Sequence, residues 1–317
     1  MKTKAARLYA KRGSLTNLCF PERLLQGAGQ KMAKCNCVNP KSWIPRLRVT
    51  LLVLGLAASV LACGGGTGSS PSGPTSPSPP PAVSACATIG GTPQGILGIL
   101  NGTPCSATQS SVVLVNLRDK DGQPTGACSG TVIAPRAVLT AAHCLSGDTA
   151  AVRIWTGAGA EIQAASYQAN PRYHGSSSSA DVANDVGVVI TVDDLNRAAI
   201  PLLVSRDARV GEQAVIAGWG NDANGNGTTL RAGTTTVAAT SATVVEAQYS
   251  SSSSSVCSGD SGGPLLLQEG GVWAIGGVTS ATTLTGSCAA GTNYFVSIRN
   301  PDIGPFIFGL VPNALRR

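Results

Sequence analysis

The sequence lacks several features that define other classes of protein. It has only two histidines, His143 and His174, and no Cys-x-x-Cys pair, so a zinc site is not indicated. It has no long segment with the 3.6-residue periodicity of an amphipathic helix, which argues against a helical domain. Its apolar run over residues 49–62 has fourteen residues, fewer than the ~20 that a membrane-spanning helix needs.

Charge is unevenly distributed along the 317 residues. Residues 1–63 contain 11 Lys and Arg and one Asp or Glu, whereas the rest of the chain contains 12 and 15. The formal net charge of +7 therefore comes from the N-terminal part, and the remainder is mildly acidic. This balance gives no reason to expect a nucleic-acid partner.

The apolar run fits the core of a signal peptide. Arg46 and Arg48 precede it, and it ends in Val60-Leu61-Ala62-Cys63, where a small residue stands before a cysteine. This end resembles a bacterial lipobox, so Cys63 is the expected lipid anchor and membrane tether, with plain secretory cleavage as the alternative. We therefore expect an exported protein, either a lipoprotein of a bacterial cell envelope or a secreted protein.

The N-terminal region divides by composition. We assign residues 1–48 to a leader and n-region, 49–62 to the signal core, and 63–81 to the anchor cysteine and a flexible Gly/Ser/Pro tether. The leader is long, and Met32 is the only methionine after Met1. Either translation starts near Met32, which gives a conventional basic n-region, or the long leader is genuine.

Short β-branched runs recur after residue 99, separated by Gly, Asn and Ser turns. This spacing predicts an all-β, antiparallel domain. The predicted strands cover residues 111–117, 151–155, 162–167, 186–192, 212–217, 234–240, 242–246, 264–267 and 272–279. A short terminal helix is expected over Ile303–Leu310, although Pro305 within it is unfavourable for a helix.

Three short motifs follow one another in the order His, Asp, Ser. They are Thr140-Ala141-Ala142-His143-Cys144, then Asn184-Asp185-Val186-Gly187, then Gly259-Asp260-Ser261-Gly262-Gly263-Pro264. Asp185 lies 42 residues after His143, and Ser261 lies 76 residues after Asp185. Each motif alone is common in an ordinary turn or core, whereas their joint occurrence in this order points to shared chemistry.

These residue types are the three parts of a nucleophilic triad. A serine hydroxyl needs an adjacent base, and a carboxylate behind a histidine fixes its tautomer. His143 is the expected base, because it follows an apolar run at a predicted strand end, whereas His174 lies in a segment typical of a surface loop. Asp185 is preferred to Asp181 because an apolar strand follows it directly.

From residue 99 to the C-terminus, these motifs resemble those of the trypsin/chymotrypsin family of serine proteases, as does Gly218-Trp219-Gly220. The resemblance implies two packed antiparallel six-stranded β-barrels with the active site in the cleft between them. It also implies a monomeric endopeptidase that hydrolyses proteins or peptides and uses no metal or cofactor. His143 and Asp185 are expected from the first barrel and Ser261 from the second.

The resemblance also assigns residues around the nucleophile. The N–H groups of Gly259 and Ser261 are the expected oxyanion hole. Asp260 is the expected partner of a new N-terminal amine at Ile99, since Ile99-Leu100-Asn101-Gly102 is similar to the start of mature family members. Residues 82–98 are then a short propeptide and residues 99–317 the protease domain.

Six of the ten cysteines lie in the exported part beyond the anchor. The resemblance implies the pairs Cys128–Cys144 and Cys257–Cys288, and we expect the remaining Cys86 and Cys105 to pair with each other. Free thiols or metal ligands at Cys86 and Cys105 are the alternative. Paired cysteines are typical of an oxidising compartment.

Four residues are expected at the primary specificity pocket by the same resemblance. Ser255, six residues before Ser261, corresponds to the floor of the pocket, so no carboxylate awaits a Lys or Arg side chain. Ser280 corresponds to the strand residue beside the pocket, and Thr282 and Thr292 correspond to its walls. Small or modest apolar P1 residues are therefore expected.

Two other functions remain open from the sequence. A catalytically silent member of the same fold would bind a partner, although silent relatives usually lose one of His143, Asp185, Ser261 or Gly259. A structural or adhesive lipoprotein would instead depend on the serine-rich segments 176–179 and 250–255.

Overall fold

The computed structural model describes residues 84–91, 101–175, 182–222, 225, 227, 229–250, 252–283, 288 and 291–317. The predicted leader, signal core, tether and Cys63 lie outside these residues, as do Ile99, Asp181 and segment 176–179. No helix in the described part of the chain is both long and apolar enough to cross a membrane.

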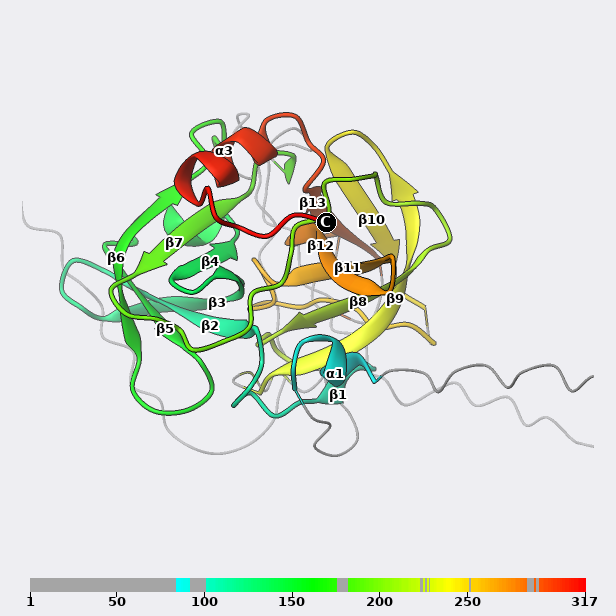
Figure 1. Cartoon of the computed structure of the whole chain (residues 1–317). Coiled ribbons are helices and arrows are strands. Elements are labelled where there is room, and N and C mark those ends of the chain that lie inside the picture. The colour runs from blue at the N-terminus through cyan, green and yellow to red at the C-terminus, as the bar shows by residue number, and fades with distance from the viewer. Residues whose placement is uncertain are drawn as a thin grey trace, which may run out of the picture. The chain divides into compact units, whose positions relative to one another are not determined.

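The first six long strands form a closed antiparallel barrel (Figure 1). Its ring order is β2-β3-β4-β7-β6-β5, and β5 closes the ring by pairing with β2. The strands are β2 (Val112–Arg118), β3 (Pro124–Ala134), β4 (Ala137–Thr140), β5 (Ala151–Trp155), β6 (Ile162–Ala169) and β7 (Gly187–Thr191).

A second closed antiparallel barrel follows in the chain. Its ring order is β8-β9-β10-β13-β12-β11, closed by the pairing of β11 with β8, and the short strand β1 (Thr103–Pro104) adds to β9. The strands are β8 (Gln213–Gly218), β9 (Arg231–Thr240), β10 (Val244–Gln248), β11 (Pro264–Glu269), β12 (Val272–Thr282) and β13 (Thr292–Ser297). The predicted pair of six-stranded barrels is confirmed.

The apolar runs of the sequence are continuous because several strands are buried on both faces. In β2, Val113 and Val115 point into the first barrel, while Val112 and Leu114 join a cluster shared by the two barrels. In β11, Leu265 and Leu267 fill the second barrel and Leu266 joins the shared cluster. Since side chains alternate between the faces of a strand, each run contributes to both layers of the core.

Helices α1 (Ala85–Thr88) and α3 (Ile303–Leu310), both short, pack on the barrels. Helix α3 has the predicted bounds, and its Pro305 lies in the first turn, where the N–H groups have no helical partner. Helix α1 packs beside β9 and β1 (Figure 1). Cys86 and Ile89 are fully buried in the shared cluster, so this segment is part of the folded domain.

Candidate active site

His143 and Asp185 meet because two neighbouring strands carry them to the same end of the first barrel. His143 begins the 3₁₀ helix η1 (His143–Leu145) just after β4, and Asp185 stands two residues before β7. In the antiparallel pair β4–β7, Thr140 is opposite Gly187, which brings the end of one strand beside the start of the other. The sequence predicted a strand over residues 186–192, and β7 begins one residue later, at Gly187.

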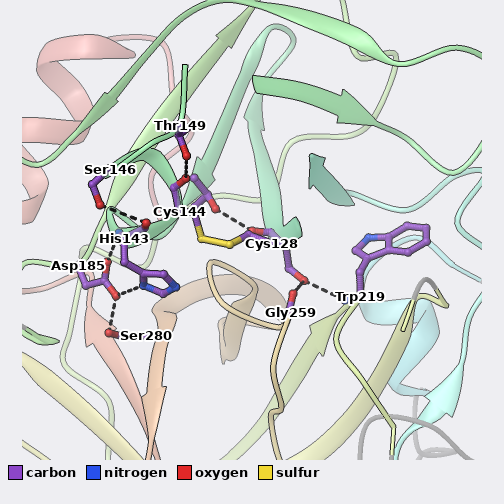
Figure 2. Close-up of a disulfide and its surroundings, with 11 residues drawn as sticks. Cys128, His143, Cys144, Ser146, Thr149, Asp185, Trp219, Gly259 and Ser280 are labelled. Atoms are coloured by element: carbon purple, nitrogen blue, oxygen red, sulfur yellow. Dashed lines mark hydrogen bonds and ion pairs between the residues drawn. A yellow bond between two sulfur atoms is a disulfide. The ribbon is translucent and has the colours of Figure 1, made fainter. Parts of the chain in front are cut away.

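Asp185 accepts three hydrogen bonds in an almost dry position (Figure 2). Asp185 is 2% exposed, whereas the His143 side chain is 31% exposed. Oδ1 accepts from the His143 backbone N–H at 2.8 Å, and Oδ2 lies 2.7 Å from His143 Nδ1. A carboxylate accepts, so the Nδ1 atom is assigned the proton, and Nε2 is left as an acceptor.

The third bond to Asp185 comes from the other barrel. The hydroxyl of Ser280, on β12, donates to Asp185 Oδ2 at 2.6 Å. Ser280 therefore connects the two barrels at the carboxylate. The sequence had predicted Ser280 beside the specificity pocket and had not predicted this contact with Asp185.

Ser261 lies on the turn that leads into β11, against the segment that carries His143. Its carbonyl accepts from the Ser129 N–H of β3 at 2.8 Å, and the Gly262 N–H donates to the Thr279 carbonyl at 2.8 Å. Gly262 has φ +82°, and a Cβ on it would lie 2.8 Å from the Ala141 nitrogen. The turn thus packs directly beside Ala141, two residues before His143.

The Ser261 hydroxyl makes no hydrogen bond to any residue that the structure describes. The structure brings His143, Asp185 and Ser280 into hydrogen-bond contact, and it places the Ser261 turn next to them without a closed Ser261–His143 bond. Nucleophile–base hydrogen bonds are often long in unliganded sites and tighten when substrate is bound.

Ser129 is a site residue that the sequence did not indicate. Its hydroxyl donates to the Gly259 carbonyl at 2.9 Å and accepts from the Trp219 N–H at 2.8 Å. It therefore links the nucleophile turn to the Gly218-Trp219-Gly220 turn. In the sequence, the one sign that Ser129 lies near the site is that it follows Cys128, which was predicted to pair with Cys144.

The backbone amides of Gly259 and Ser261 donate to no group in the described part of the chain. Gly259 has φ +95°, a conformation that favours glycine. Between these amides, the Asp260 N–H donates to the Cys257 carbonyl at 3.0 Å. The turn thus leaves two neighbouring N–H groups available to an external acceptor.

Asp260 is buried beneath the turn. Its Oδ1 accepts from the Gly220 N–H and its Oδ2 from the Cys257 N–H, both at 2.8 Å. A Cβ on Gly218 would lie 2.2 Å from Oδ1, and one on Gly220 would lie 2.6 Å from Oδ2. The two glycines of the Gly-Trp-Gly turn therefore leave room for this carboxyl group.

Burial raises the pKa of the Asp260 carboxyl from an ordinary 3.8 to about 6, against the two backbone donors and the nearby charge of Arg231, which favour the ionised form. The carboxyl is thus a poorly solvated group that needs favourable partners when it is charged.

Of the expected pocket residues, Ser280 and Thr282 lie on β12 and Thr292 on β13, whereas Ser255 lies in the segment between β10 and β11. Ser255 is fully buried, and its hydroxyl lies 3.1 Å from Oδ1 of Asn293, which is also fully buried. Asn293 is opposite Thr282 across the β12–β13 pair, and Thr292 precedes it on β13. Asn293 was not anticipated, because its contact with Ser255 joins positions 38 residues apart in the chain.

The described cysteines form three disulfides, Cys86–Cys105, Cys128–Cys144 and Cys257–Cys288. They are the three pairs expected from the sequence. Cys128, His143 and Cys144 are also close enough to suggest a metal site. Because the two sulfurs are bonded to each other, they are not available as thiolate ligands.

The fold and the site define a protein of the chymotrypsin-like, two-barrel class. The trypsin family model matches residues 99–307, and the chain therefore belongs to the trypsin family of serine proteases. Membership implies protein substrates, and the disulfides are consistent with export.

Individual relatives are distant. Trypsin delta of Drosophila erecta is 25% identical over 66% of this chain and 88% of its own length. A chymotrypsin of Phaedon cochleariae is 33% identical over 47% of this chain and 62% of its own. A solved collagenase structure has a TM-score of 0.55 and 20% identity, covering 67% of this chain and 98% of its own. A mutant of human heparin binding protein has a TM-score of 0.54 and 20% identity, covering 68% and 97%.

Proposed function

We propose that this chain is an exported serine endopeptidase that uses Ser261, His143 and Asp185 as its catalytic triad. The observation that carries the proposal is the contact of His143 Nδ1 with buried Asp185, directly beside the Ser261 turn. The alternative, a silent binding module, is not favoured, because each group that the chemistry needs is present.

The reaction follows from the positions of these groups. The Ser261 oxygen attacks the scissile carbonyl and its proton passes to His143 Nε2, while Asp185 stabilises the imidazolium. The amides of Gly259 and Ser261 hold the oxyanion, and loss of one such donor typically costs about 10²–10³ in rate. His143 then gives the proton to the leaving amine. In the second half of the reaction, water attacks the acyl-enzyme, its proton passes to His143, and His143 returns a proton to the Ser261 oxygen as the acid product leaves.

Hydrolysis of peptides by the exported protein tests this proposal. Ser261→Ala is expected to abolish turnover while the melting temperature changes little, because Ser261 is half-buried on a turn. His143→Ala should do the same, whereas the exposed His174→Ala is the matched control and should retain full activity. Equal activity in wild type and Ser261→Ala would contradict the proposal.

The P1 preference belongs to the same proposal. An uncharged floor made by Ser255 and Asn293, with Thr282 and Thr292 as walls and Ser280 beside them, favours small or modest apolar P1 side chains. Cleavage should therefore occur after Ala, Val or Leu, and Ser255→Asp should shift it toward Lys and Arg. Strong wild-type cleavage after Lys or Arg, with none after Ala, Val or Leu, would contradict this preference.

Activation and location are also proposed from the sequence. Cleavage before Ile99 frees an amine that pairs with Asp260, and Cys63 carries the lipid that tethers the domain through residues 64–81. The disulfide Cys86–Cys105 then keeps the N-terminal piece attached to the protease after the cut.

A further inference from the structure

A buried carboxylate beneath the nucleophile turn needs a positive charge nearby. Asp260 is 1% exposed and lies between the two amides assigned to the oxyanion hole. Two backbone N–H groups, those of Gly220 and Cys257, donate to it at 2.8 Å. Neutral donors alone leave an ionised carboxylate poorly compensated in a dry environment.

Arg231 supplies a cation close to this carboxylate. It is 5% exposed, and its Nη1 donates to the Gly220 carbonyl at 2.9 Å, while its Nη2 lies 3.3 Å from Asp222 Oδ2. The N–H of the same Gly220 donates to Asp260. Gly220 is therefore held between the guanidinium and the carboxyl, and the charge of Arg231 lowers the pKa of Asp260 against the effect of burial.

Strand pairing fixes this arrangement. Arg231 is the first residue of β9 and is opposite Gly218 of β8, the residue whose Cα faces the Asp260 carboxyl. On its other side, Arg231 is opposite Pro104 of β1. Arg231 thus pairs with both β8, whose Gly218 lies against the Asp260 carboxyl, and β1.

We propose that Arg231 is a positioning residue that holds Asp260, and with it the Gly259–Ser261 turn, in the reactive arrangement before the chain is cut at Ile99. This inference rests on the proposed function, and it deepens it by assigning activity to the uncut protein. A free amine at Ile99 then adds a second cation near the Asp260 carboxylate, in addition to Arg231.

The test measures how fast a fluorophosphonate labels Ser261 in protein carrying Ile99→Pro, which keeps the chain uncut at that bond. We expect labelling of this protein, a fall of at least about tenfold in Arg231→Gln, and near-full labelling in Arg231→Lys. A tenfold fall in rate is smaller than the roughly 10²–10³-fold fall that follows loss of one oxyanion donor, because the turn is expected to be only partly displaced. Gln can still donate to Gly220, so the Gln–Lys difference isolates the charge.

Arg197→Gln is the matched control, since Arg197 also donates to a backbone carbonyl, that of Thr156 at 2.8 Å. It should label like the parent. Melting curves show which variants are folded, and Arg231→Lys keeps the test decisive if Arg231→Gln unfolds, because a charge role requires Lys to label at near-parent rate.

Three results would overturn the inference: no labelling of the uncut parent while the wild-type chain cut at Ile99 is labelled, equal labelling of folded Arg231→Gln and the parent, or a folded Arg231→Lys that labels at least tenfold more slowly. Failure of both cut and uncut wild-type protein to react would instead contradict the proposed function. In a chain that begins at Ile99, the effect of Arg231→Gln should be smaller.

Discussion

At the scale of single residues, the site depends on how buried carboxyl groups are satisfied. Asp185 receives His143 from one barrel and Ser280 from the other. Asp260 receives two backbone amides and has Arg231 nearby. The Ser280 contact is the one that joins the barrels at the proposed triad, so its removal should affect chemistry more than folding.

Ser280→Ala is expected to lower kcat/KM by about tenfold, since a hydrogen bond to a charged group contributes about 1.5–3 kcal/mol. Peptide hydrolysis measures the change. Ser146→Ala is the control, because the exposed Ser146 hydroxyl donates to the His143 carbonyl at 3.1 Å without contacting Asp185. Equal activity in both variants would show that Ser280 does not support the carboxylate.

Asp260 predicts a pH dependence of stability. The folded state holds a proton to a pKa of about 6, whereas an ordinary carboxyl releases it near 3.8, and Arg231 is charged throughout this range. The free energy of unfolding should therefore fall as pH rises from about 4 to about 6, by up to about 3 kcal/mol.

Urea unfolding of the uncut protein between pH 4 and pH 7 measures this dependence. Asp260→Asn should remove that part of the slope, and the exposed Asp148→Asn should leave it in place. The same slope in wild type and Asp260→Asn would rule out this carboxyl as its source.

At the scale of elements, the sequence predicted several strands with nearly their observed bounds. Residues 151–155 match β5, and the predicted 264–267 and 272–279 lie within β11 and β12. β13 was not predicted, because its six residues gain their burial only between β10 and β12. β9 begins three residues before its predicted start, because β1 and β8 pair with Arg231 and Ala232.

The residues of the site also differ in how far the sequence could indicate them. The motifs were sufficient to indicate His143, Asp185 and Ser261, since chemistry restricts their residue types. Ser129, Asn293 and Arg231 are polar residues of ordinary strands, and nothing in their local sequence indicates their partners, which are Gly259, Ser255 and Gly220 respectively. Helix α1 has four residues, too few for local propensity to indicate, and forms because Cys86 and Ile89 are buried.

The turn before β11 tolerates no side chain at Gly262. A Cβ there would lie 2.2 Å from Thr140 Oγ1 and 2.3 Å from the Ser129 carbonyl, at φ +82°. Gly262→Ala should therefore lower the free energy of unfolding by more than about 2 kcal/mol and abolish activity.

Gly271→Ala is the matched control for Gly262, because Gly271 has φ +78° but nothing within 4 Å of its Cβ position. It should lose only about 1 kcal/mol through backbone strain and keep its activity. Urea unfolding separates the two, and equal losses would mean that the packing of the Gly262 turn does not matter.

At the scale of the whole molecule, segment 84–91 and the two barrels belong to one folded unit. Cys86 is bonded to Cys105 across the predicted cut before Ile99, and Ile89 is fully buried. A cut sample should therefore keep one mass until it is reduced, and then separate into two. Non-reducing and reducing electrophoresis measure this, with Cys86→Ser as control; separation without reductant would contradict the tether.

The reactivity of Ser261 is the central claim, and the intact mass of the reduced, exported protein after exposure to a fluorophosphonate tests it most directly. The account predicts a single adduct that maps to Ser261 and is absent from Ser261→Ala. A folded wild-type chain without an adduct, or an adduct that persists in Ser261→Ala, would contradict it.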